Sequence, residues 1–310
     1  MNVDTRYTAG HLAALRRFAA AITVLTLLGH TVLGFEQSYA QPLVALATAY
    51  SMQFVLERLD AALTRRRPRY GGGVVPAIDF FLSAHITALA IAMLLYYNDR
   101  LWDVAFATSV AIASKYIFRA PIGVGTRHVF NPSNFGITVT LLLFPWIGLV
   151  PPWQFLTELN GVWDWVLPGT IFVLGTFLNA VYTKRIPLIV AWLVSFVLQA
   201  VVRYLFFDGL IAVMLAPATG VAAMLFTFYM APDPATTPNG VRGQIVFGAS
   251  IGIIYGVLVI LHIVFGLFIA LTVVCATRGV GLYLISRFGA DDPARGRQPM
   301  AASVLTSPMA

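Results

Sequence analysis

Charged residues are scarce in this chain, and their scarcity excludes most classes of soluble protein. Only 11% of the 310 residues are Asp, Glu, Lys or Arg, against about 25% in an ordinary soluble domain. Hydrophobic residues make up 59%, and the mean hydropathy is +0.81. A soluble globule cannot remove so large a share of apolar surface from water. The composition therefore predicts a polytopic membrane protein with little mass outside the bilayer.

Cysteine is nearly absent, and this excludes several kinds of site. With Cys275 as the single cysteine, the chain alone cannot hold a disulfide framework, a Cys-based zinc site or an iron–sulfur cluster. None of the five histidines pair at a spacing typical of a metal or haem site, so we expect no metal. The sequence also lacks a Walker A motif, a GxGxxG turn after a strand and a GxSxG elbow.

Long apolar runs are what the sequence has in quantity. A bilayer-crossing helix needs about 20 mostly apolar residues. Ten runs are candidates: 15–34, 40–57, 74–97, 101–119, 135–151, 164–182, 186–206, 209–230, 243–261 and 263–285. They predict an all-α, polytopic fold in which residues 1–287 form one transmembrane domain. The Pro-, Ala- and Ser-rich remainder, 288–310, is predicted to be a disordered cytoplasmic tail.

The distribution of basic residues predicts an orientation. If the N-terminus is cytoplasmic, all of the 20 Lys and Arg residues except Arg100 and Arg203 fall on the cytoplasmic side of these ten spans. This asymmetry follows the positive-inside rule and places both termini in the cytoplasm. Topology therefore accounts for the net charge of +7, and we expect no nucleic-acid partner.

Two predicted cytoplasmic loops combine polar residues with proline at the start of a span. The first, 120–136, includes Arg-His-Val-Phe-Asn-Pro-Ser-Asn at 127–134, and the second, 230–240, includes Asp-Pro-Ala-Thr-Thr-Pro at 233–238. Free N–H groups at a helix start attract anions or electron-rich rings, and amide side chains both donate and accept, as the edge of a flavin or quinone requires. Ordinary N-caps and loop punctuation use the same residues, so both interpretations stay open.

The candidate binding residues come from these two loops. They are Arg127, His128, Asn131, Ser133, Asn134, Asp233, Thr236 and Thr237.

A few ionisable residues lie near the predicted cytoplasmic ends of the spans. Such residues are rare within spans, so each is a candidate for a structural or functional role. Asp79 lies in the third predicted span, and Lys115 and Arg119, four positions apart, share a helix face of the fourth. Asp79 could form a structural ion pair with one of these cations or with Arg127. The same residues could instead neutralise a phosphate or tune a redox group, and the sequence leaves this choice open.

The motifs of the two loops resemble those of a known superfamily. Phe-Asn-Pro at 130–132, Phe-Pro at 144–145 and Met-Ala-Pro-Asp-Pro-Ala-Thr-Thr-Pro at 230–238 are similar to strings in two related proteins. These are the D subunit of the Rnf electron-transport complex and the B subunit of the sodium-pumping NADH:quinone oxidoreductase. Residues 127–137 and 228–238 resemble most the branch of enediyne-biosynthesis membrane proteins. The resemblance extends over about 75–285, with order and spacing kept.

The resemblance implies electron transfer through a flavin, coupled to ions, in a multi-pass protein of a bacterial cytoplasmic membrane with other electron-transport subunits as partners. Energy-converting members carry FMN on the threonine of a Ser-Gly-Ala-Thr motif in the outer loop after the fifth span. The corresponding loop here, 151–161, has Thr157 but no such motif, so we expect no covalent FMN.

The resemblance leaves a noncovalent cofactor as the expectation. FMN, riboflavin or a quinone would lie between the two cytoplasmic loops, with Arg127 and His128 stabilising its reduced, anionic form and the other candidate residues contacting its ring. A transporter of a small solute or natural product, as the enediyne branch suggests, is the alternative. A purely structural subunit of a larger membrane assembly is the third hypothesis.

Overall fold

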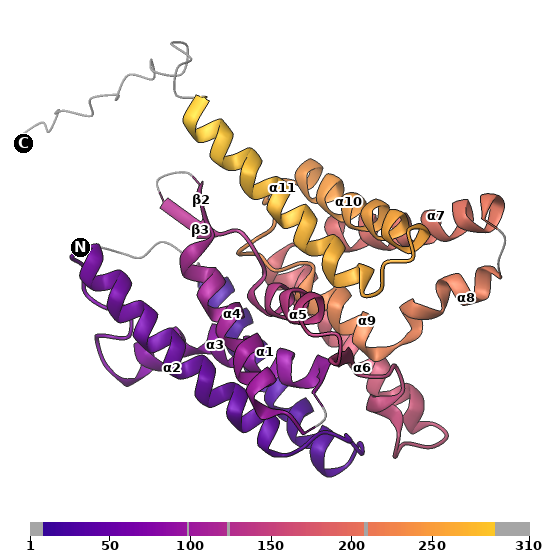
Figure 1. Cartoon of the computed structure of the whole chain (residues 1–310), viewed down its shortest axis with the longest axis horizontal. Coiled ribbons are helices and arrows are strands. Elements are labelled where there is room, and N and C mark those ends of the chain that lie inside the picture. The colour runs from indigo at the N-terminus through magenta and orange to yellow at the C-terminus, as the bar shows by residue number, and fades with distance from the viewer. Residues whose placement is uncertain (1–8, 98, 123–124, 208–209, 289–310) are drawn as a thin grey trace, which may run out of the picture.

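The computed structural model describes residues 9–97, 99–122, 125–207 and 210–288, and the chain is helical over most of this length (Figure 1). The long helices are α1 (Ala9–Thr31), α2 (Ala40–Leu63), α3 (Val74–Leu94), α4 (Leu101–Ile117), α5 (Pro132–Leu143), α6 (Trp163–Leu178), α7 (Ile186–Phe206), α10 (Val241–Ile260) and α11 (Gly266–Phe288). The short helices are η1 (Gln154–Leu156), η2 (Asn179–Thr183), α8 (Ile211–Leu215), η3 (Ala216–Thr219), α9 (Val221–Leu225) and η4 (Phe226–Met230).

Two small antiparallel pairs complete the described elements. Strand β1 (Leu95–Tyr96) pairs with β4 (Gly148–Leu149), and β2 (Arg119–Ile122) pairs with β3 (Gly125–His128) in a hairpin. The predicted all-α class is therefore confirmed in its main feature. Of the predicted tail, residues 289–310 lie outside the described part of the chain.

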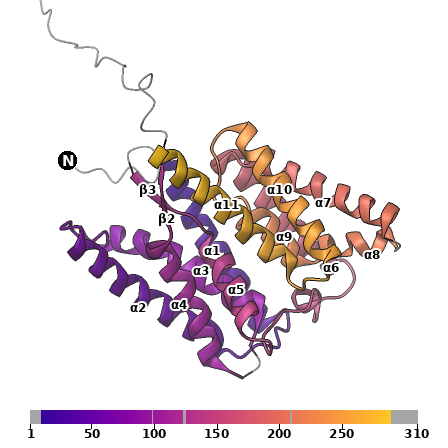
Figure 2. The same ribbon diagram turned by 45° about the horizontal axis from the view of Figure 1, so that its top comes forward.

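The helices form two groups that meet along α5 and α11 (Figures 1 and 2). In the first group α2 packs on α3 and α4, and α4 packs on α5; in the second, α10 packs along α7 and on α11. Glycines spaced four apart on α10 permit the contact with α7, as GxxxG spacing predicts. A Cβ on Gly248 would collide with the carbonyl oxygen of Leu188, and one on Gly252 would meet Ser195.

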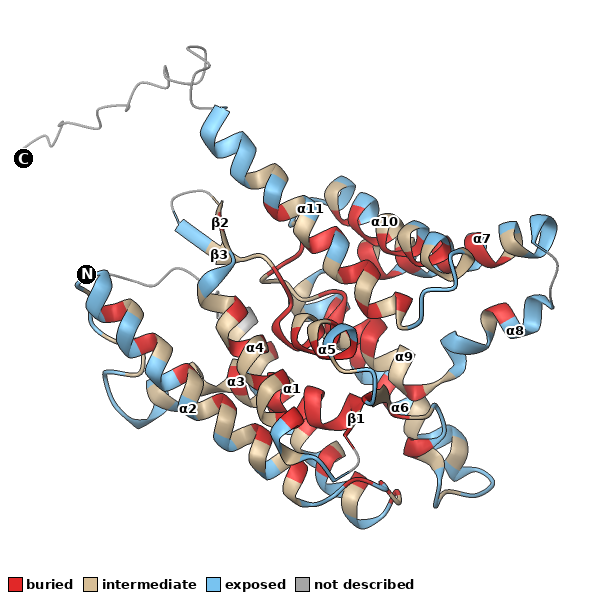
Figure 3. Ribbon diagram, viewed as in Figure 1, coloured by how far each residue is buried: buried red, intermediate tan, exposed pale blue. Residues whose placement is uncertain are grey.

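The buried core runs through both groups, whereas the outer faces are apolar and exposed (Figure 3). On α7, for example, Val190, Val194, Val197 and Leu198 are each about half exposed. Six helices are long and apolar enough to cross a membrane: Leu12–Thr31, Val74–Leu94, Trp163–Thr183, Ile186–Phe206, Val241–Ile260 and Gly266–Phe288. Long apolar helices with exposed apolar faces are the features of a multi-pass membrane protein.

The structure divides the ten predicted runs differently. Each contains helix, but by length and composition the described residues hold six spans, or seven if the bent pair Ile211–Thr219 and Val221–Met230 counts as one. That pair bends by 66° where Gly220 follows a short turn containing Pro217. The predicted run 135–151 is helical only as far as Leu143, because the next residue precedes Pro145 and is therefore extended.

Candidate functional site

The β2–β3 hairpin leads the chain from α4 to the start of α5, where Asn131 is the N-cap. Its Oδ1 accepts hydrogen bonds from the backbone N–H of Asn134 (3.1 Å) and from the hydroxyl of Ser133 (2.8 Å). Pro132 occupies the first helical position, where a missing N–H costs nothing. The capping interpretation of this motif is therefore confirmed, although it does not account for the whole Asn131 side chain.

The other half of the Asn131 amide joins the two candidate loops. Its Nδ2 donates to the backbone carbonyl of Met230 (3.2 Å) and to Oδ2 of Asp233 (3.4 Å). These residues are 99 and 102 positions away in the sequence. One buried side chain thus caps α5 and holds the second loop against it.

The second loop is a compact turn organised by Asp233. Its backbone carbonyl accepts from the N–H groups of Thr236 and Thr237, both at 3.1 Å, and from the hydroxyl of Thr237 at 2.7 Å. Its carboxylate accepts from the N–H of Ala235 at 3.0 Å. These local bonds hold the turn together.

Two arginines from other elements fasten this turn. Arg185, buried at the N-cap of α7, donates from Nε to the Thr237 hydroxyl (2.9 Å) and from Nη2 to the side-chain oxygen of Asn239 (2.8 Å). Arg278 of α11 donates from Nη1 to the carbonyl of Thr236 (2.9 Å). The loop before α10 is consequently tied to both neighbouring helices.

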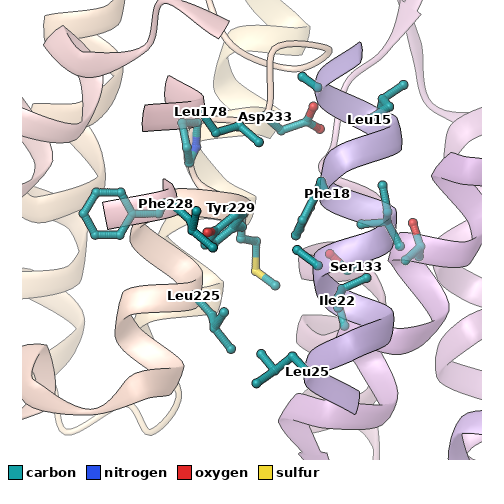
Figure 4. A pocket seen from close by; sticks show the side chains of 18 of the residues that line it. Leu15, Phe18, Ile22, Leu25, Ser133, Leu178, Leu225, Phe228, Tyr229 and Asp233 are labelled. Carbon is teal, nitrogen blue, oxygen red and sulfur yellow. The ribbon is translucent and has the colours of Figure 1, made fainter. Parts of the chain in front are cut away.

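A cavity of about 420 Å³, the apolar cavity, lies between α1, α3, α6 and η4 next to both loops. Phe18 of α1 and Tyr229 of η4 stack on one another at its wall, with ring centroids 4.9 Å apart (Figure 4). Polar side chains gather where the loops reach it: His128, Asn131, Ser133, Asn179, Thr183 and Asp233. The cavity therefore has an apolar body and one polar end.

A second cavity, of about 530 Å³, is the basic cavity. Its charged and histidine side chains are Arg69, Asp79, Lys115, Arg119, Arg127, His128, Lys184 and Arg185. It shares part of its wall with the apolar cavity: Ser83, His128, Thr183, Pro234 and Ala235 line both. An apolar space and a cationic space thus adjoin each other beside the two loops.

Asp79 forms an ion pair, but with a residue other than the three candidates Lys115, Arg119 and Arg127. Both carboxylate oxygens accept hydrogen bonds from Arg16 of α1, at 2.8 and 2.7 Å, because α1 packs against α3 and presents this arginine. Lys115 instead donates to Oε1 of Gln53 (2.6 Å) and to the hydroxyl of Ser83 (3.0 Å).

The eight candidate residues divide by what they line. His128, Asn131, Ser133 and Asp233 line the apolar cavity, and Arg127 with His128 lines the basic one. The remaining three, Asn134, Thr236 and Thr237, are buried and line neither cavity. Asn134 donates to the carbonyl of Phe268 (3.0 Å) and to the hydroxyl of Thr272 (2.8 Å), so it fastens α5 to α11.

Burial shifts the pKa of two groups near the shared wall in directions that reduce their charge. Burial raises the pKa of the Asp233 carboxyl, against the opposing effects of the Ala235 N–H and the Arg185 cation. Burial likewise lowers the pKa of Arg185, and the neighbouring cations Arg127 and Arg278 lower it further while Asp233 opposes them.

Sequence reasoning singled out five of the eight charged and histidine side chains of the basic cavity and missed the other three. Arg69, Lys184 and Arg185 come from two loops that it treated only as carriers of positive charge. The one available signal was Arg185-Ile186-Pro187, an arginine directly before a proline-started helix.

Two further observations concern a covalent flavin and a metal, neither of which the sequence predicts. Thr157, in the loop 151–161, donates its hydroxyl hydrogen to the carbonyls of Trp153 (3.2 Å) and Gln154 (3.3 Å). Within the described ranges, no three His, Cys, Asp or Glu side chains gather as a metal site would require.

No family model and no curated protein sequence matches this chain. The two loops and the two cavities they line are therefore the basis for inferring function.

Proposed function

We propose that this protein transfers electrons in the membrane through a noncovalent flavin or quinone held in the apolar cavity. The observation that carries the proposal is the convergence of His128, Asn131, Ser133 and Asp233 at one end of that cavity. Ligand cavities are mostly apolar, with a few convergent polar groups, and have volumes of about 300–1,000 Å³. At about 420 Å³, the apolar cavity has the volume and the polarity that a flat ring with one polar edge requires.

The chain's own residues would orient such a ring. The stacked pair Phe18 and Tyr229 and the surrounding leucines offer apolar wall to its faces (Figure 4). Ser133 donates to Asn131, which leaves its hydroxyl oxygen able to accept from the polar edge of the ring, and His128 lines the same end of the cavity. The cofactor supplies the electron chemistry, while the protein positions it and sets the charge around it.

Asp233 suits a proton-holding role beside such a cofactor. Its carboxyl lines the cavity and its pKa is raised by burial, so a proton can reside on this oxygen closer to neutral pH than on an ordinary aspartate. Reduction of a flavin or quinone adds negative charge that a nearby proton or cation offsets.

The sequence resemblance supports the same proposal. The strings at 127–137 and 228–238 that resemble flavin-binding electron-transport subunits are the segments that meet at the cavity. By that resemblance we propose a bacterial cytoplasmic membrane as the location, other electron-transport subunits as partners, and FMN, riboflavin or a quinone as the cofactor. Cytoplasmic termini and ten crossings belong to the same proposal.

Transport of a small solute is the second candidate, and one observation favours it. The helix pair around Gly220 bends by 66°, and α5 has only 12 residues. Discontinuous and short helices form substrate sites in many membrane carriers. In that case the apolar cavity would hold the solute, and no chromophore would accompany the protein.

The test is the visible absorption spectrum of the full chain purified in detergent, before and after acid precipitation, together with solvent extraction for quinones. We expect a flavin band that acid releases into the supernatant, or an extracted quinone. Tyr229→Leu should lower the cofactor content several-fold, because it removes the aromatic wall. The matched control is Phe206→Leu, at an exposed position of α7 away from the cavity, which should leave the content unchanged.

Either of two results would contradict the proposal. A protein with no flavin or quinone, and none taken up when supplied, would favour transport, which substrate-dependent flux in vesicles would then measure. Colour that stays with the acid precipitate would mean a covalent flavin.

A further inference from the structure

The basic cavity contains more cations than carboxylates can neutralise. Six of its wall residues are Lys or Arg, and Asp79 is its one acidic wall residue among those described. That carboxylate is already held by Arg16, which approaches from α1 and is not part of the wall. The cavity's own cations must therefore find their counter-charge elsewhere.

Two of the six cations, Arg69 and Arg119, form ion pairs with carboxylates of α2. Arg119 pairs with Asp60 at 3.1 Å, and Arg69 lies 3.5 Å from the same carboxylate and 3.7 Å from that of Glu57. Arg66, which does not line the cavity, also forms ion pairs with both of these carboxylates. This network is balanced to within one charge and leaves no carboxylate for the rest of the cavity.

The other four cations are Lys115, Arg127, Lys184 and Arg185. Within the described part of the chain, none has a carboxylate at salt-bridge distance. Lys115 bonds to a neutral amide and a hydroxyl, and Arg185 is 4% exposed and bonds to a hydroxyl and an amide oxygen. Of the four, Arg185 is buried and Lys184 is exposed, and Asp233 attracts Lys115 and Arg185 from beyond salt-bridge distance. Four cations around one cavity, with no carboxylate paired to any of them among the described residues, favour an anionic ligand.

A topogenic role does not explain this placement. Basic residues that set orientation need only face the cytoplasm, where water solvates them. Here they line one cavity of about 530 Å³, and Arg127 and Arg185 lie close enough to repel one another. Lys184 is the C-cap of η2, with the left-handed backbone (φ 55°) that often ends a helix, and it directly precedes Arg185 at the start of α7.

We infer that the basic cavity binds the phosphate group of an organic phosphate monoester, with Arg127, Lys184 and Arg185 as its main cations and the ester's apolar part in the adjoining apolar cavity. A phosphate monoester carries about −1.5 to −2 charges at pH 7, which suits several cations better than one carboxylate would. Guanidinium groups bind phosphate oxygens through paired donors. The shared wall at Ser83, His128 and Thr183 is where the two parts of the ligand would join.

The inference does not depend on electron transfer. A transported phosphate ester, a phosphate-bearing cofactor and an anionic lipid would all present the same head group. Loss of flavin or quinone binding would therefore leave it intact, and failure of phosphate binding would leave the redox proposal standing for riboflavin or a quinone.

The experiment is equilibrium dialysis of the full chain, in an uncharged detergent, against radiolabelled inorganic phosphate. We expect saturable binding at one phosphate per chain, weakened about tenfold by Arg127→Gln and by Lys184→Gln, since each removes a charge-assisted contact. Within the described residues, neither side chain makes a hydrogen bond or ion pair, and their backbone bonds do not depend on the side chain. Both variants should therefore keep the wild-type melting temperature.

The matched control is Arg242→Gln. Arg242 is exposed at the start of α10 and lines neither cavity, so its loss should leave phosphate binding unchanged. An equal loss in all three variants would mean nonspecific attraction to positive charge and would overturn the inference, as would the absence of saturable binding at millimolar phosphate.

Competition identifies the source of the phosphate. The competitors are glycerol 3-phosphate in solution and phosphatidic acid at a few mole percent in phosphatidylcholine nanodiscs. Stronger displacement by phosphatidic acid assigns the site to a lipid head group, and stronger displacement by glycerol 3-phosphate assigns it to a soluble ester. Displacement by neither would overturn the assignment to an organic phosphate monoester.

Discussion

The loop before α5 and the loop before α10 look alike in sequence, yet their side chains do different things. Both combine proline with Asn, Ser, Thr or Asp directly before a long apolar run. In the first loop Arg127, His128 and Ser133 face cavities. In the second, Asp233 also lines the apolar cavity, but Thr236 and Thr237 are buried and bonded to the turn itself or to arginines.

The difference shows how one polar composition can serve binding or folding. In a compact turn, the hydrogen-bonding groups of a polar side chain bond to nearby backbone groups. When such a side chain is also buried, it cannot reach a ligand, and its role is structural. The same side chain at the end of a hairpin, with a cavity beside it, keeps hydrogen-bonding capacity for a ligand. Asn131 belongs to both categories, because it caps α5 and also bonds to the second loop.

The largest expected effect tests the structural character of the second loop. Arg185→Met removes two charge-assisted donors from the buried turn and should lower the free energy of unfolding by about 3 kcal/mol. Thermal unfolding in detergent, followed by circular dichroism, measures the loss.

The control for this prediction is Arg242→Met, at an exposed position, where surface substitutions change stability by about 0.5 kcal/mol or less. Equal, small effects of both substitutions would show that the second loop does not depend on Arg185.

A smaller effect is expected at Asn131, where the two loops meet. Asn131→Ala removes the N-cap and should cost about 1–2 kcal/mol. Asn131→Ser keeps a capping oxygen but loses the Nδ2 donor to Met230, so we expect a melting temperature between wild type and the alanine variant. If serine equals wild type, the bond between the loops adds no stability; if serine equals alanine, the cap adds none.

Much of the fold follows from local sequence properties. Apolar runs of helical length predict where helices form, and the structure has helix in each of the ten. The Asn-Pro-Ser-Asn string predicts the start of α5, because capping depends on neighbouring residues alone. GxxxG spacing on α10 likewise predicts its close contact with another helix, though it does not identify α7.

What the sequence could not give depends on contacts between distant segments. Asp79 had three nearby cations as candidates, and the choice of Arg16 depends on how α1 packs against α3. The basic cavity brings together Arg69, Arg127 and Lys184 from three separate parts of the chain, and in the sequence Arg69 and Lys184 are each indistinguishable from an ordinary topogenic charge. Pro145 indicates that α5 ends just before it, but the apolar residues around Pro145 predict a longer helix.

The smallest expected change in stability gives the sharpest contrast between the loops. Ser133→Ala and Thr236→Val each remove one hydroxyl, and each should cost about 1 kcal/mol or less, since the Thr236 hydroxyl bonds are long, at 3.3 and 3.5 Å. Only Ser133 lines the apolar cavity. We therefore expect Ser133→Ala to lower the flavin or quinone that the purified protein retains, and Thr236→Val to leave it unchanged. Equal retention by both variants, or a loss confined to Thr236→Val, would mean that the first loop is no more a binding loop than the second.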